Sequence, residues 1–549
     1  MPREFDPAAH TLATLLEVQV AAGPDRTAVA YPHASVTFRE LRDRAGALAR
    51  SLLAHDAGAG RRIGLFLPNC LEYIDALFAA ALVGAQVVPI NARFKRRELA
   101  HVVARSEIAI LLTSSEAADH VDFPGLVLDS LPGLAAAEPG RPVALETAPH
   151  LRHVVVLGAA RPPLTPYESF LAAGADVPPE AVEEATRRAR SDDVATVLYT
   201  SGTAADPKGC KLTHRALISA WWAYAEAVDL ADDTPLWSPC PMFHVGGIGP
   251  LTAAMTVGAT FVSAPHFDAD EALEQLLAEG AVHLFPAFPA FTLGVLRAPA
   301  YRPERFGSVR TVLNVAPPDT EELIQSMLPP TAVLLNDFGM TEAAGMVTFT
   351  PVTDSPGDRL RTNGVPFPGL EIRITEEDGV TELPVGEEGE IQFRGPNAMS
   401  GYLNDPEATA RTIIDGGWVR TGDRGRLDDR GHLVYVGRIK EMLKVGGENV
   451  APAEVEMLLS THPAVAMAQV VGKPDARYGE VAVAFVELLP GRTASEAELL
   501  DHCRGQIANF KLPREVRFVT EWPMSATKVQ KFRLRELLAD AGATETLAS

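Results

Sequence analysis

The sequence contains few cysteines. Only four occur among 549 residues, at Cys70, Cys210, Cys240 and Cys503, and they form neither a CxxC pair nor a metal-ligand spacing. This scarcity excludes a small disulfide scaffold and a cysteine-based zinc site. We expect reduced thiols that pack in the interior of a cytoplasmic protein.

Long hydrophobic runs are also missing. The best candidate for a membrane span, residues 71–90, is interrupted by Glu72, Asp75, Gly84 and Gln86, whereas a span needs roughly 18 consecutive apolar residues. We therefore expect a buried helix followed by a strand, and no membrane span. The opening residues, MPREFDPAAH, carry acidic side chains and no apolar segment, which argues against a signal peptide.

Basic residues are outnumbered. The chain has 49 Lys and Arg against 71 Asp and Glu, a formal net charge of -22. A field of this sign repels polyanions, so we expect no nucleic-acid partner and a small-molecule substrate instead. The length exceeds the roughly 250–300 residues that one hydrophobic core supports, which predicts at least two domains.

The first part of the chain alternates strand-like and helix-like segments, the pattern of a parallel sheet covered by helices. Residues 131–191 are rich in Pro, Ala and Glu, and we expect a surface excursion there. We expect the next unit to open with VATVLYT (194–200) and to alternate helices again with apolar strands such as TAVLLNDFG (331–339). The expected elements before the excursion are strands at 62–69, 86–91 and 108–114 and helices at 71–83 and 97–105.

From about residue 360 the strands become shorter and alternate with turn signals, which predicts a small antiparallel or barrel-like subdomain with a turn at 429–431. After Gly437 the pattern changes to that of a small α+β domain. The elements expected there are helices near 451–460, 495–508 and 531–539 and the strands AMAQVVG, VAVAFVEL and REVRFV.

The stretch YTSGTAADPKG (199–209) is a candidate phosphate loop. A strand precedes it and a helix is expected near Thr213, an arrangement that directs backbone N–H groups at an anion. It is not a Walker loop, because Pro207 stands where that pattern requires Gly. Alone, it could equally be a solvated turn. Its candidate contacts are Gly202 and Gly209 for close approach, the hydroxyls of Thr200, Ser201 and Thr203, and the charge of Lys208.

Three distant stretches support a nucleotide site. In NDFGMTE (336–342), Phe338 could stack on a base while Glu342 holds Mg²⁺ at the phosphates. Asp423 at the end of WVRTGD could accept hydrogen bonds from two ribose hydroxyls, and Arg438 could act similarly. Each stretch alone has an ordinary interpretation as a turn or solvated face.

From about residue 27 to about residue 540 the chain resembles the adenylate-forming superfamily of acyl-CoA synthetases, aryl-CoA ligases, peptide adenylation domains and luciferases. The resemblance rests on YTSGTAADPKG at 199–209, PMFHVGG at 241–247, NDFGMTEA at 336–343, GYLNDPEAT at 401–409, GGWVRTGD at 416–423, YVGRIKEMLKVGGENVAPAEVE at 435–456 and PMSATKVQKFRLRE at 523–536.

The resemblance implies an α/β fold in which a large N-terminal AMP-binding domain, residues 1–438, contains two doubly wound α/β subdomains and a small β-barrel-like subdomain. A small mobile α+β domain, residues 439–549, follows a hinge at Lys440. It also implies a reaction in which a carboxylate attacks the α-phosphorus of Mg·ATP to give acyl-AMP and pyrophosphate, after which a thiol displaces AMP.

The resemblance also assigns roles to individual residues. Thr341, Glu342 and Lys528 would be catalytic, with Glu342 holding Mg²⁺ and Lys528 bridging the carboxylate and the α-phosphate. The implied nucleotide contacts are Thr200, Ser201, Gly202, Thr203, Lys208, Asp337, Phe338, Gly339, Thr341, Asp423, Arg438 and Lys528; the implied CoA contacts are Lys444, Gly446 and Gly447; and the implied acyl-pocket residues are His244, Val245, Gly246 and Gly247.

Two departures from the family pattern stand out. Ala204-Ala205 replace the usual Thr-Gly of the phosphate loop, which predicts a reshaped pyrophosphate contact. Thr527 precedes Lys528 where the family has Gly, so Lys531 remains a weaker alternative for the adenylation lysine. The aromatic stretch at 221–224 could wall the acyl pocket or belong to the core.

The expected function is an ATP-dependent acyl-CoA ligase that uses ATP, Mg²⁺ and coenzyme A. Small residues without a fixed cation at 242–249 favour an apolar acid, medium- or long-chain, alicyclic or aromatic, and hence a place in fatty acid or lipid metabolism. Two alternatives remain, a free-standing enzyme that loads a carrier-protein phosphopantetheine and a non-catalytic nucleotide-binding regulator. The sequence does not determine whether the protein forms a homodimer.

Overall fold

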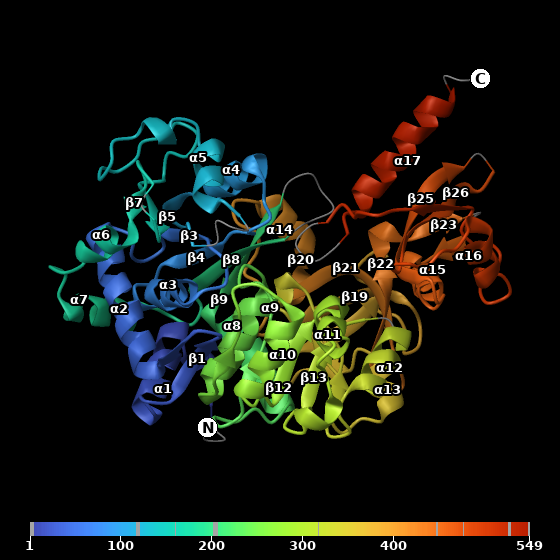
Figure 1. The fold of residues 1–549 in the computed structure, drawn as a ribbon, viewed down its shortest axis with the longest axis horizontal. Helices are drawn as coiled ribbons and strands as arrows, with labels where there is room; N and C mark the ends of the chain where they lie inside the picture. Colours follow the sequence, from blue (N-terminus) through green and yellow to red (C-terminus); the bar gives the residue numbers. More distant parts are fainter. Residues whose placement is uncertain are drawn as a thin grey trace. The chain divides into compact units, whose positions relative to one another are not determined.

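The computed structural model (Figure 1) describes residues 5–116, 121–159, 161–200, 207–316, 318–445, 448–475, 477–524 and 529–546, with only the backbone of 448–449 and 539–546. The chain divides into two compact units. The first comprises Met1–Ala316, Thr320–Glu371 and Phe393–Val419, and the second comprises Pro317–Asp319, Ile372–Gln392 and Arg420–Ser549. The expected division into a domain of residues 1–438 and a mobile domain of residues 439–549 stays a prediction.

One sheet of the first unit has the strand order β7-β6-β5-β3-β4-β8-β9. Its strands are parallel except β9, which runs antiparallel to β8. Most are almost entirely buried because helices cover both faces, which is why they read as continuous apolar runs. The strands are β3 (Arg62–Phe66), β4 (Gln86–Pro89), β5 (Ile108–Ser114), β6 (His153–Leu157), β7 (Thr165–Pro166), β8 (Val194–Thr200) and β9 (Lys208–Thr213).

The surface excursion expected at residues 131–191 is wrong. Strand β6 lies within that range and pairs in parallel with β5, and β7 extends the same sheet. The apolar run HVVVL of β6 is short and is surrounded by Pro, Ala and Glu. Because of these neighbours, the sequence pattern did not predict a strand at β6, whose last four residues are buried.

The other large sheet of the first unit has the order β14-β13-β12-β10-β11-β1-β2. It is parallel except for β2, which forms an antiparallel hairpin with β1. The strands are β1 (Thr27–Tyr31), β2 (Ala34–Thr37), β10 (Leu236–Trp237), β11 (Phe261–Val262), β12 (His283–Ala287), β13 (Thr311–Asn314) and β14 (Val333–Leu335).

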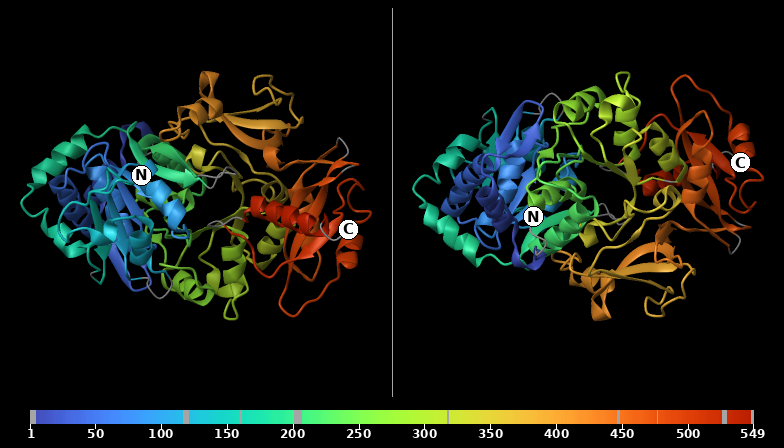
Figure 2. Two further views of the ribbon diagram at one scale, coloured as in Figure 1. Left: turned by 90° about the horizontal axis from the view of Figure 1, so that it is seen from above. Right: turned by 90° about the horizontal axis from the view of Figure 1, so that it is seen from below.

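Helices cover both faces of each sheet. The central core joins side chains of both sheets with α1, α2, α3, α8 and α9, so these helices lie between the sheets. In β3, Ile63 and Leu65 face this core while Phe66 faces the outer core with α4 and α5. Helices α10, α11 and α12 cover the outer face of the other sheet. The expected doubly wound α/β arrangement is therefore confirmed (Figures 1 and 2).

The helices of the first unit have ends set by ordinary capping. Thr11, Thr37 and Thr213 cap α1, α2 and α8 by accepting hydrogen bonds from first-turn N–H groups. The helices are η1 (Pro7–Ala9), α1 (Leu12–Ala22), α2 (Phe38–Ala54), α3 (Leu71–Leu82), α4 (Arg96–Arg105), α5 (Phe123–Ser130), η2 (Leu134–Ala136), α6 (Tyr167–Ala172), α7 (Pro179–Arg188), α8 (His214–Ala227), α9 (Val245–Val257), α10 (Ala269–Ala278), α11 (Pro289–Leu296), η3 (Pro303–Phe306), α12 (Pro318–Met327), η4 (Thr341–Ala343), α13 (Pro356–Arg361), α14 (Pro406–Thr412) and η5 (Asp415–Gly417).

The apolar stretch at 71–90 forms α3 followed by β4, as expected. Among the residues that the structure describes, no helix is both long and apolar enough to span a membrane. Cys210, Cys240 and Cys503 are buried, and Cys70 is half-buried. All four have free thiols, consistent with packing roles.

Short antiparallel strands follow β14. The strand expected at 331–339 is interrupted at Asn336, since its second half belongs to a separate sheet of β15 (Asp337–Phe338), β16 (Thr348–Phe349) and β17 (Val365–Pro366). A further sheet contains β18 (Glu371–Thr375), β19 (Gly389–Arg394), β20 (Ile413–Ile414), β21 (Trp418–Leu427) and β22 (Leu433–Arg438). The turn expected at 429–431 joins β21 to β22, and Gly431 has a φ of 82° there.

The C-terminal part of the second unit is a small α+β fold, as expected. Strands β23, β25 and β26 pair antiparallel and β27 adds in parallel to β26. Helices α15 and α16 share a core with the sheet, and α17 packs through Leu534 and Leu538. The elements are η6 (Ile439–Glu441), β23 (Leu443–Val445), β24 (Glu448–Val450), α15 (Pro452–Ser460), β25 (Val465–Asp475), β26 (Gly479–Leu488), α16 (Glu496–Cys503), β27 (Glu515–Phe518) and α17 (Lys531–Thr546).

Candidate active site

The candidate phosphate loop connects two antiparallel strands. Thr200 ends β8 and Lys208 begins β9, and the two are paired across the hairpin. The Thr200 hydroxyl donates to the carbonyl oxygen of Lys208 at 3.4 Å. Ser201, Gly202 and Thr203 lie outside the described residues, as do Ala204 and Ala205.

The helix expected near Thr213 is confirmed, but a strand that the sequence did not predict lies between it and the loop. Strand β9 separates them, and α8 begins only at His214, where the Thr213 hydroxyl accepts a hydrogen bond from the N–H of Ala216 at 3.0 Å. Two lysines and a glycine in KGCKLT concealed the strand in the sequence. Because β9 lies between the loop and α8, and Thr213 caps that helix, the structure does not support the predicted contribution of this helix N-terminus to anion binding.

Tyr402 joins two of the expected phosphate-site residues. Its hydroxyl donates a hydrogen bond to Glu342 Oε1 at 2.7 Å, and the Nζ of Lys208 lies 5.2 Å from the centre of its ring. The same segment is held against β9, because the N–H of Leu403 donates to Gly209 O at 2.7 Å. Burial, and then the charge of Glu342, raise the pKa of Tyr402, so the hydroxyl keeps its proton at neutral pH.

Thr341 and Glu342 belong to the short helix η4 next to β9. The Cys210 thiol lies 3.6 Å from the carbonyl oxygen of Thr341, and the N–H of Met399 donates to the carbonyl oxygen of Glu342 at 2.8 Å. Glu342 is 8% exposed. The structure thus brings together Lys208, Thr341 and Glu342. It adds Tyr402, which belongs to the GYLNDPEAT motif but had no predicted role.

Asp337 and Phe338 lie on β15. Both are almost buried, and the side-chain amide of Asn363 donates to the carbonyl oxygen of Asp337 at 3.1 Å. Burial raises the pKa of the Asp337 carboxyl to about 7. Stacking of Phe338 on adenine and nucleotide contacts from Asp337 and Gly339 stay predictions.

The expected acyl-pocket residues form the start of α9. His244 is the N-cap residue of the helix and its ring centre lies 4.7 Å from that of Phe243. Val245, Gly246 and Gly247 make up the first turn. In the aromatic stretch at 221–224, Trp221 and Tyr224 are fully buried, whereas Trp222 is half-buried against Phe5.

The second unit contains the expected ribose-binding pair. Asp423 on β21 and Arg438 at the end of β22 are directly opposite one another in the sheet. Arg438 Nε lies 2.9 Å from Asp423 Oδ1, and Asp423 is 2% exposed. The guanidinium therefore compensates an otherwise buried carboxylate, which can still accept further hydrogen bonds.

The remaining expected residues of the second unit are less fully described. Lys440 lies in the short helix η6 and Lys444 is exposed on β23. Gly446, Gly447 and Lys528 lie outside the described residues. The alternative lysine, Lys531, is engaged by two carboxylates, since its Nζ lies 2.6 Å from Glu456 Oε1 and 3.5 Å from Glu441 Oε2.

The donor set suits a magnesium ion that is bound mainly by phosphate oxygens. Among the described residues no group of three or more His, Cys, Asp or Glu side chains could hold a metal on its own. Glu342 offers a single carboxylate, and Tyr402 occupies only one of its oxygens. Mg²⁺ usually binds to one or two carboxylates and to substrate phosphates, so the residues present fit it.

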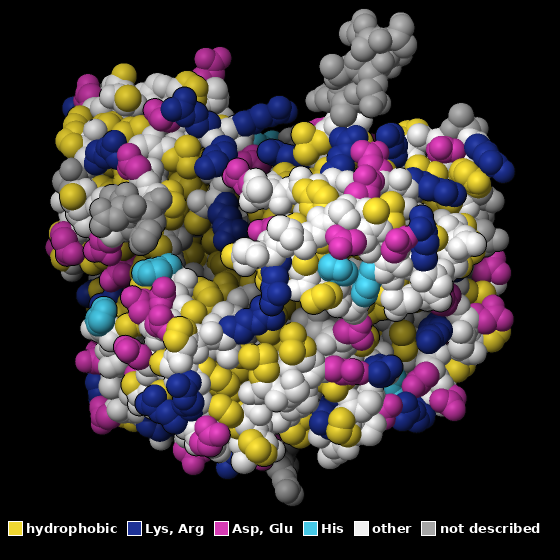
Figure 3. All heavy atoms as spheres, turned by 45° about the vertical axis from the view of Figure 1, so that its right-hand side comes forward, with side chains coloured by type: hydrophobic (Ala, Val, Ile, Leu, Met, Phe, Trp, Pro, Cys, Tyr) yellow, Lys and Arg dark blue, Asp and Glu magenta, His cyan; other side chains and the backbone are white. Residues whose placement is uncertain are grey.

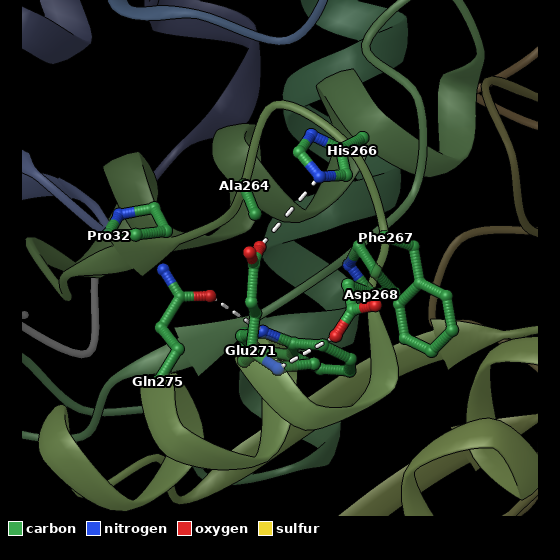
Figure 4. Close-up of a pocket in the computed structure, with 10 residues that line it drawn as sticks. Pro32, Ala264, His266, Phe267, Asp268, Glu271 and Gln275 are labelled. Atoms are coloured by element: carbon green, nitrogen blue, oxygen red, sulfur yellow. Dashed lines mark hydrogen bonds and ion pairs between the residues drawn. The ribbon is translucent and has the colours of Figure 1, made fainter.

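A separate small pocket lies near the start of α10 (Figure 4). It measures about 10 Å³, room for about one water molecule. His266 points toward Glu271 across it, at 3.8 Å. The side chains that line it include none of the expected site residues.

On the molecular face in Figure 3, Lys and Arg are interspersed with Asp and Glu.

Known proteins resemble the chain over nearly its whole length. Residues 16–403 match the AMP-binding enzyme family and residues 454–528 match the AMP-binding enzyme C-terminal domain. A CoA ligase of Mycobacterium tuberculosis, named for a 7a-methyl-1,5-dioxo-octahydroindenyl-propanoyl group, is 34% identical over 96% of this chain and 99% of its own. The indoleacetate–CoA ligase of Aromatoleum aromaticum is 32% identical over 94% of this chain and 96% of its own.

Solved structures have the same fold. ATP-bound MatB from Rhodopseudomonas palustris superimposes with a TM-score of 0.79 at 26% identity, covering 96% of this chain and 99% of its own. The anthranilate CoA ligase AuaEII in complex with anthranoyl-AMP gives a TM-score of 0.83 at 24% identity, covering 98% and 99%. The chain therefore belongs to the AMP-binding enzyme family, and within it to the AMP-forming acyl-CoA ligases.

Proposed function

We propose that this enzyme activates an apolar carboxylic acid, medium- or long-chain, alicyclic or aromatic, as an acyl-AMP and transfers the acyl group to coenzyme A. The observation that carries the proposal is the link through Tyr402, which holds the carboxylate of Glu342 and contacts the cation of Lys208. A cation and a carboxylate held at fixed positions beside a glycine-containing hairpin are what a magnesium-bound triphosphate requires.

In the first half-reaction the acid and ATP are both anions, so the protein must supply positive charge and oriented donors rather than a strong base. Lys208, Thr200 and the loop 201–206 would bind the β- and γ-phosphates, and Thr341 would contact the α-phosphate. Mg²⁺, held by Glu342, would neutralise phosphate charge. Lys528 would bridge the attacking carboxylate and the α-phosphate.

Residues of the second unit would also bind the nucleotide and serve the second half-reaction. Asp423 would accept hydrogen bonds from the ribose hydroxyls, with Arg438 beside it. We further propose that residues 439–549 move about Lys440 between the half-reactions. Lys444, Gly446 and Gly447 would then contact the pantetheine of CoA.

The acid itself is proposed from the apolar residues at the start of α9. Val245, Gly246 and Gly247 offer no charged group for a second carboxylate, and His244 borders the same turn. The names of two relatives specify a bulky bicyclic acid and an indole acid, which supports a cyclic, largely apolar acid here. A place in fatty acid or lipid metabolism and a cytoplasmic location are proposals of the same kind.

One experiment separates this proposal from its alternatives. The full-length enzyme is incubated with ATP, Mg²⁺ and a panel of fatty, alicyclic and aromatic acids, and AMP release is measured with CoA, with a phosphopantetheinylated carrier protein, and with no thiol. We expect acid-dependent AMP release that CoA accelerates. Acceleration by the carrier protein alone would favour the carrier-loading alternative, and ATP binding without AMP release for any acid would favour the regulator.

The Lys528→Ala variant tests the proposed role of Lys528 in acyl-AMP formation. It should abolish acyl-AMP formation while ATP binding, measured by calorimetry, stays within about twofold of wild type, because the β- and γ-phosphate contacts come from elsewhere. Unchanged AMP release by this variant would contradict the role of Lys528.

A further inference from the structure

A set of buried polar side chains in the first unit has no role in the reaction steps proposed above. Tyr224 on α8 and Glu321 on α12 are 0% exposed, and Asp337 on β15 is 7% exposed. The Tyr224 hydroxyl and Glu321 Oε2 have no hydrogen-bond partner among the described residues. Buried polar groups are nearly always satisfied, and each unsatisfied one disfavours the folded state. These groups therefore indicate a ligand that supplies the missing partner.

The ring of Tyr224 is held firmly, so its hydroxyl has a defined position. Phe285 and Phe349 each contact it edge-on, with ring centres 5.6 Å away, and Trp221 lies 5.7 Å away on the same helix. Burial, and then the charge of Asp337, raise the pKa of Tyr224. Asp337 is directly opposite Phe349 in the β15–β16 pair, so the two side chains lie on the same face of that sheet, and the Phe349 ring in turn contacts Tyr224.

Trp221, on the same helix as Tyr224, lies close to the residues expected to form the acyl pocket. The Trp221 indole N–H donates to the carbonyl oxygen of Ala344 at 2.8 Å. At Gly345, which has a φ of 114°, an added Cβ would lie 2.9 Å from the Trp221 ring and 3.2 Å from a methyl group of Val245. A Cβ at Gly339 would lie 1.8 Å from Gly345 O and 3.1 Å from Asp337 Oδ2. These contacts connect Val245 of the pocket, through Trp221 and Gly345, to Asp337.

The polar set lies where α/β folds usually bind their ligands. Asn314 ends β13 and Asp337 follows β14, so both stand at the carboxyl ends of parallel strands. Behind them, the Asn314 side-chain amide donates to Glu321 Oε1 at 3.1 Å, and the Thr292 hydroxyl donates to Asn314 Oδ1 at 2.6 Å. Burial raises the pKa of Glu321 to about 8. A protonated acid there can donate a hydrogen bond.

We propose that the Tyr224 hydroxyl and the Asp337 carboxyl bind an oxygen substituent of the acid, a keto or hydroxyl group remote from its carboxylate. This inference rests on the proposed function and narrows its substrate class to largely apolar acids with such an oxygen. The Tyr224 hydroxyl donates to the oxygen, and Asp337 accepts from a hydroxyl or, when protonated, donates to a ketone. The Asp337 side chain then faces the acid, not the nucleotide contact expected from the sequence.

The test compares matched acids. Cyclohexylpropanoate and decahydronaphthylpropanoate are each supplied with and without a ring keto or hydroxyl group, and kcat/KM is measured from AMP release in the presence of CoA. We expect wild type to prefer the oxygenated member of a pair by about 10- to 100-fold, because a site built to hydrogen-bond an oxygen rejects the analogue that leaves its groups unpaired.

Variants assign the preference to the residues. Tyr224→Phe should reduce the preference at least about tenfold, through loss of kcat/KM for the oxygenated acid only. Asp337→Asn keeps the size of the side chain and should change the relative preference for ketone and alcohol. Tyr301→Phe removes a hydroxyl that already has a partner, the carbonyl oxygen of Met327 at 2.9 Å, and should leave the preference unchanged. Thermal unfolding of each variant verifies that it is folded.

The outcomes distinguish the two proposals. Equal kcat/KM for both members of every pair in wild type would overturn this inference and leave the acyl-CoA ligase function standing. A Tyr224→Phe variant that loses activity on both members equally would also overturn it, since that is what a structural role predicts. Absence of AMP release with every acid would overturn the proposed function together with the inference.

Discussion

Tyr402→Phe is the most informative single substitution in the phosphate site. The change removes one oxygen, which donates to Glu342 Oε1 at 2.7 Å, and it keeps the ring that lies 5.2 Å from Lys208 Nζ. Both partners are almost buried, with 8% exposure each. The variant therefore isolates the hydrogen bond that orients the carboxylate expected to hold Mg²⁺.

The magnitude follows from the kind of bond. A hydrogen bond to a charged group contributes about 1.5–3 kcal/mol, and each 1.4 kcal/mol corresponds to about a factor of ten in an equilibrium. If the bond acts on Glu342 in the ATP complex, kcat/KM for ATP should fall by about 10- to 100-fold. The apparent affinity for Mg²⁺ should fall with it, because the carboxylate is no longer held in one orientation.

The assay is ATP–pyrophosphate exchange with a saturating acid, at varied ATP and varied free Mg²⁺. Binding of Mg·ATP measured by calorimetry gives a readout independent of turnover. Tyr301→Phe is the control, because it removes a hydroxyl that donates to the carbonyl oxygen of Met327 at 2.9 Å, away from the expected phosphate site. If Tyr402→Phe left kcat/KM for ATP and Mg²⁺ affinity within twofold of wild type, Tyr402 would not position Glu342.

Three further predictions concern the buried Glu321, the expected hinge at Lys440 and the paired Lys531. Burial raises the pKa of the Glu321 carboxyl from 4.5 to about 8, so this group ionises more readily in the unfolded state than in the folded one. The wild-type protein should therefore lose stability, of order a few kcal/mol, as the pH rises from 5 to 8. Glu321→Gln should reduce this loss, as measured by thermal unfolding at several pH values. Lys440→Pro should leave ATP–pyrophosphate exchange near wild type and slow acyl transfer to CoA, since a hinge must change its backbone angles; equal loss of both steps would refute the hinge. Lys531→Ala should lower the free energy of unfolding by roughly 1–3 kcal/mol, measured as a lower unfolding temperature, because Glu456 loses its ion-pair partner, while acyl-AMP formation is retained. Loss of that formation with unchanged stability would instead make Lys531 the adenylation lysine.

The sequence predicted most of what depends on local pattern. The apolar runs of β3, β4 and β5 lie in one sheet as expected, because continuous burial on both faces leaves a clear signal in the residues themselves. The expectation that the run of β8 opens a second unit is wrong, since β8 pairs in parallel with β4 in the same sheet. The strand β6 and the hairpin strand β9 were missed. Strand β6 is surrounded by Pro and Ala and pairs with β5, which is distant in the sequence, whereas β9 contains Lys and Gly and pairs with β8 in a hairpin.

In the candidate active site, too, local motifs were predicted and contacts between distant segments were not. Motif spacing identified Lys208 and Glu342, but it could not show that Tyr402, 60 residues beyond Glu342, contacts both. The polar set around Tyr224 was likewise invisible, because the aromatic stretch at 221–224 fits a core helix equally well. Long-range contacts of this kind depend on how α8, β15 and the segment around 402 pack, which the pattern of any one segment does not encode.

The most direct test of the central claim is identification of the nucleotide product. Full-length enzyme is incubated with ATP, Mg²⁺, CoA and each acid of the panel, and the products are separated by chromatography and mass spectrometry. The account predicts acid-dependent formation of AMP, pyrophosphate and acyl-CoA in equal amounts, with ATP–pyrophosphate exchange when CoA is omitted. Formation of ADP in place of AMP, or no exchange with any acid, would contradict it.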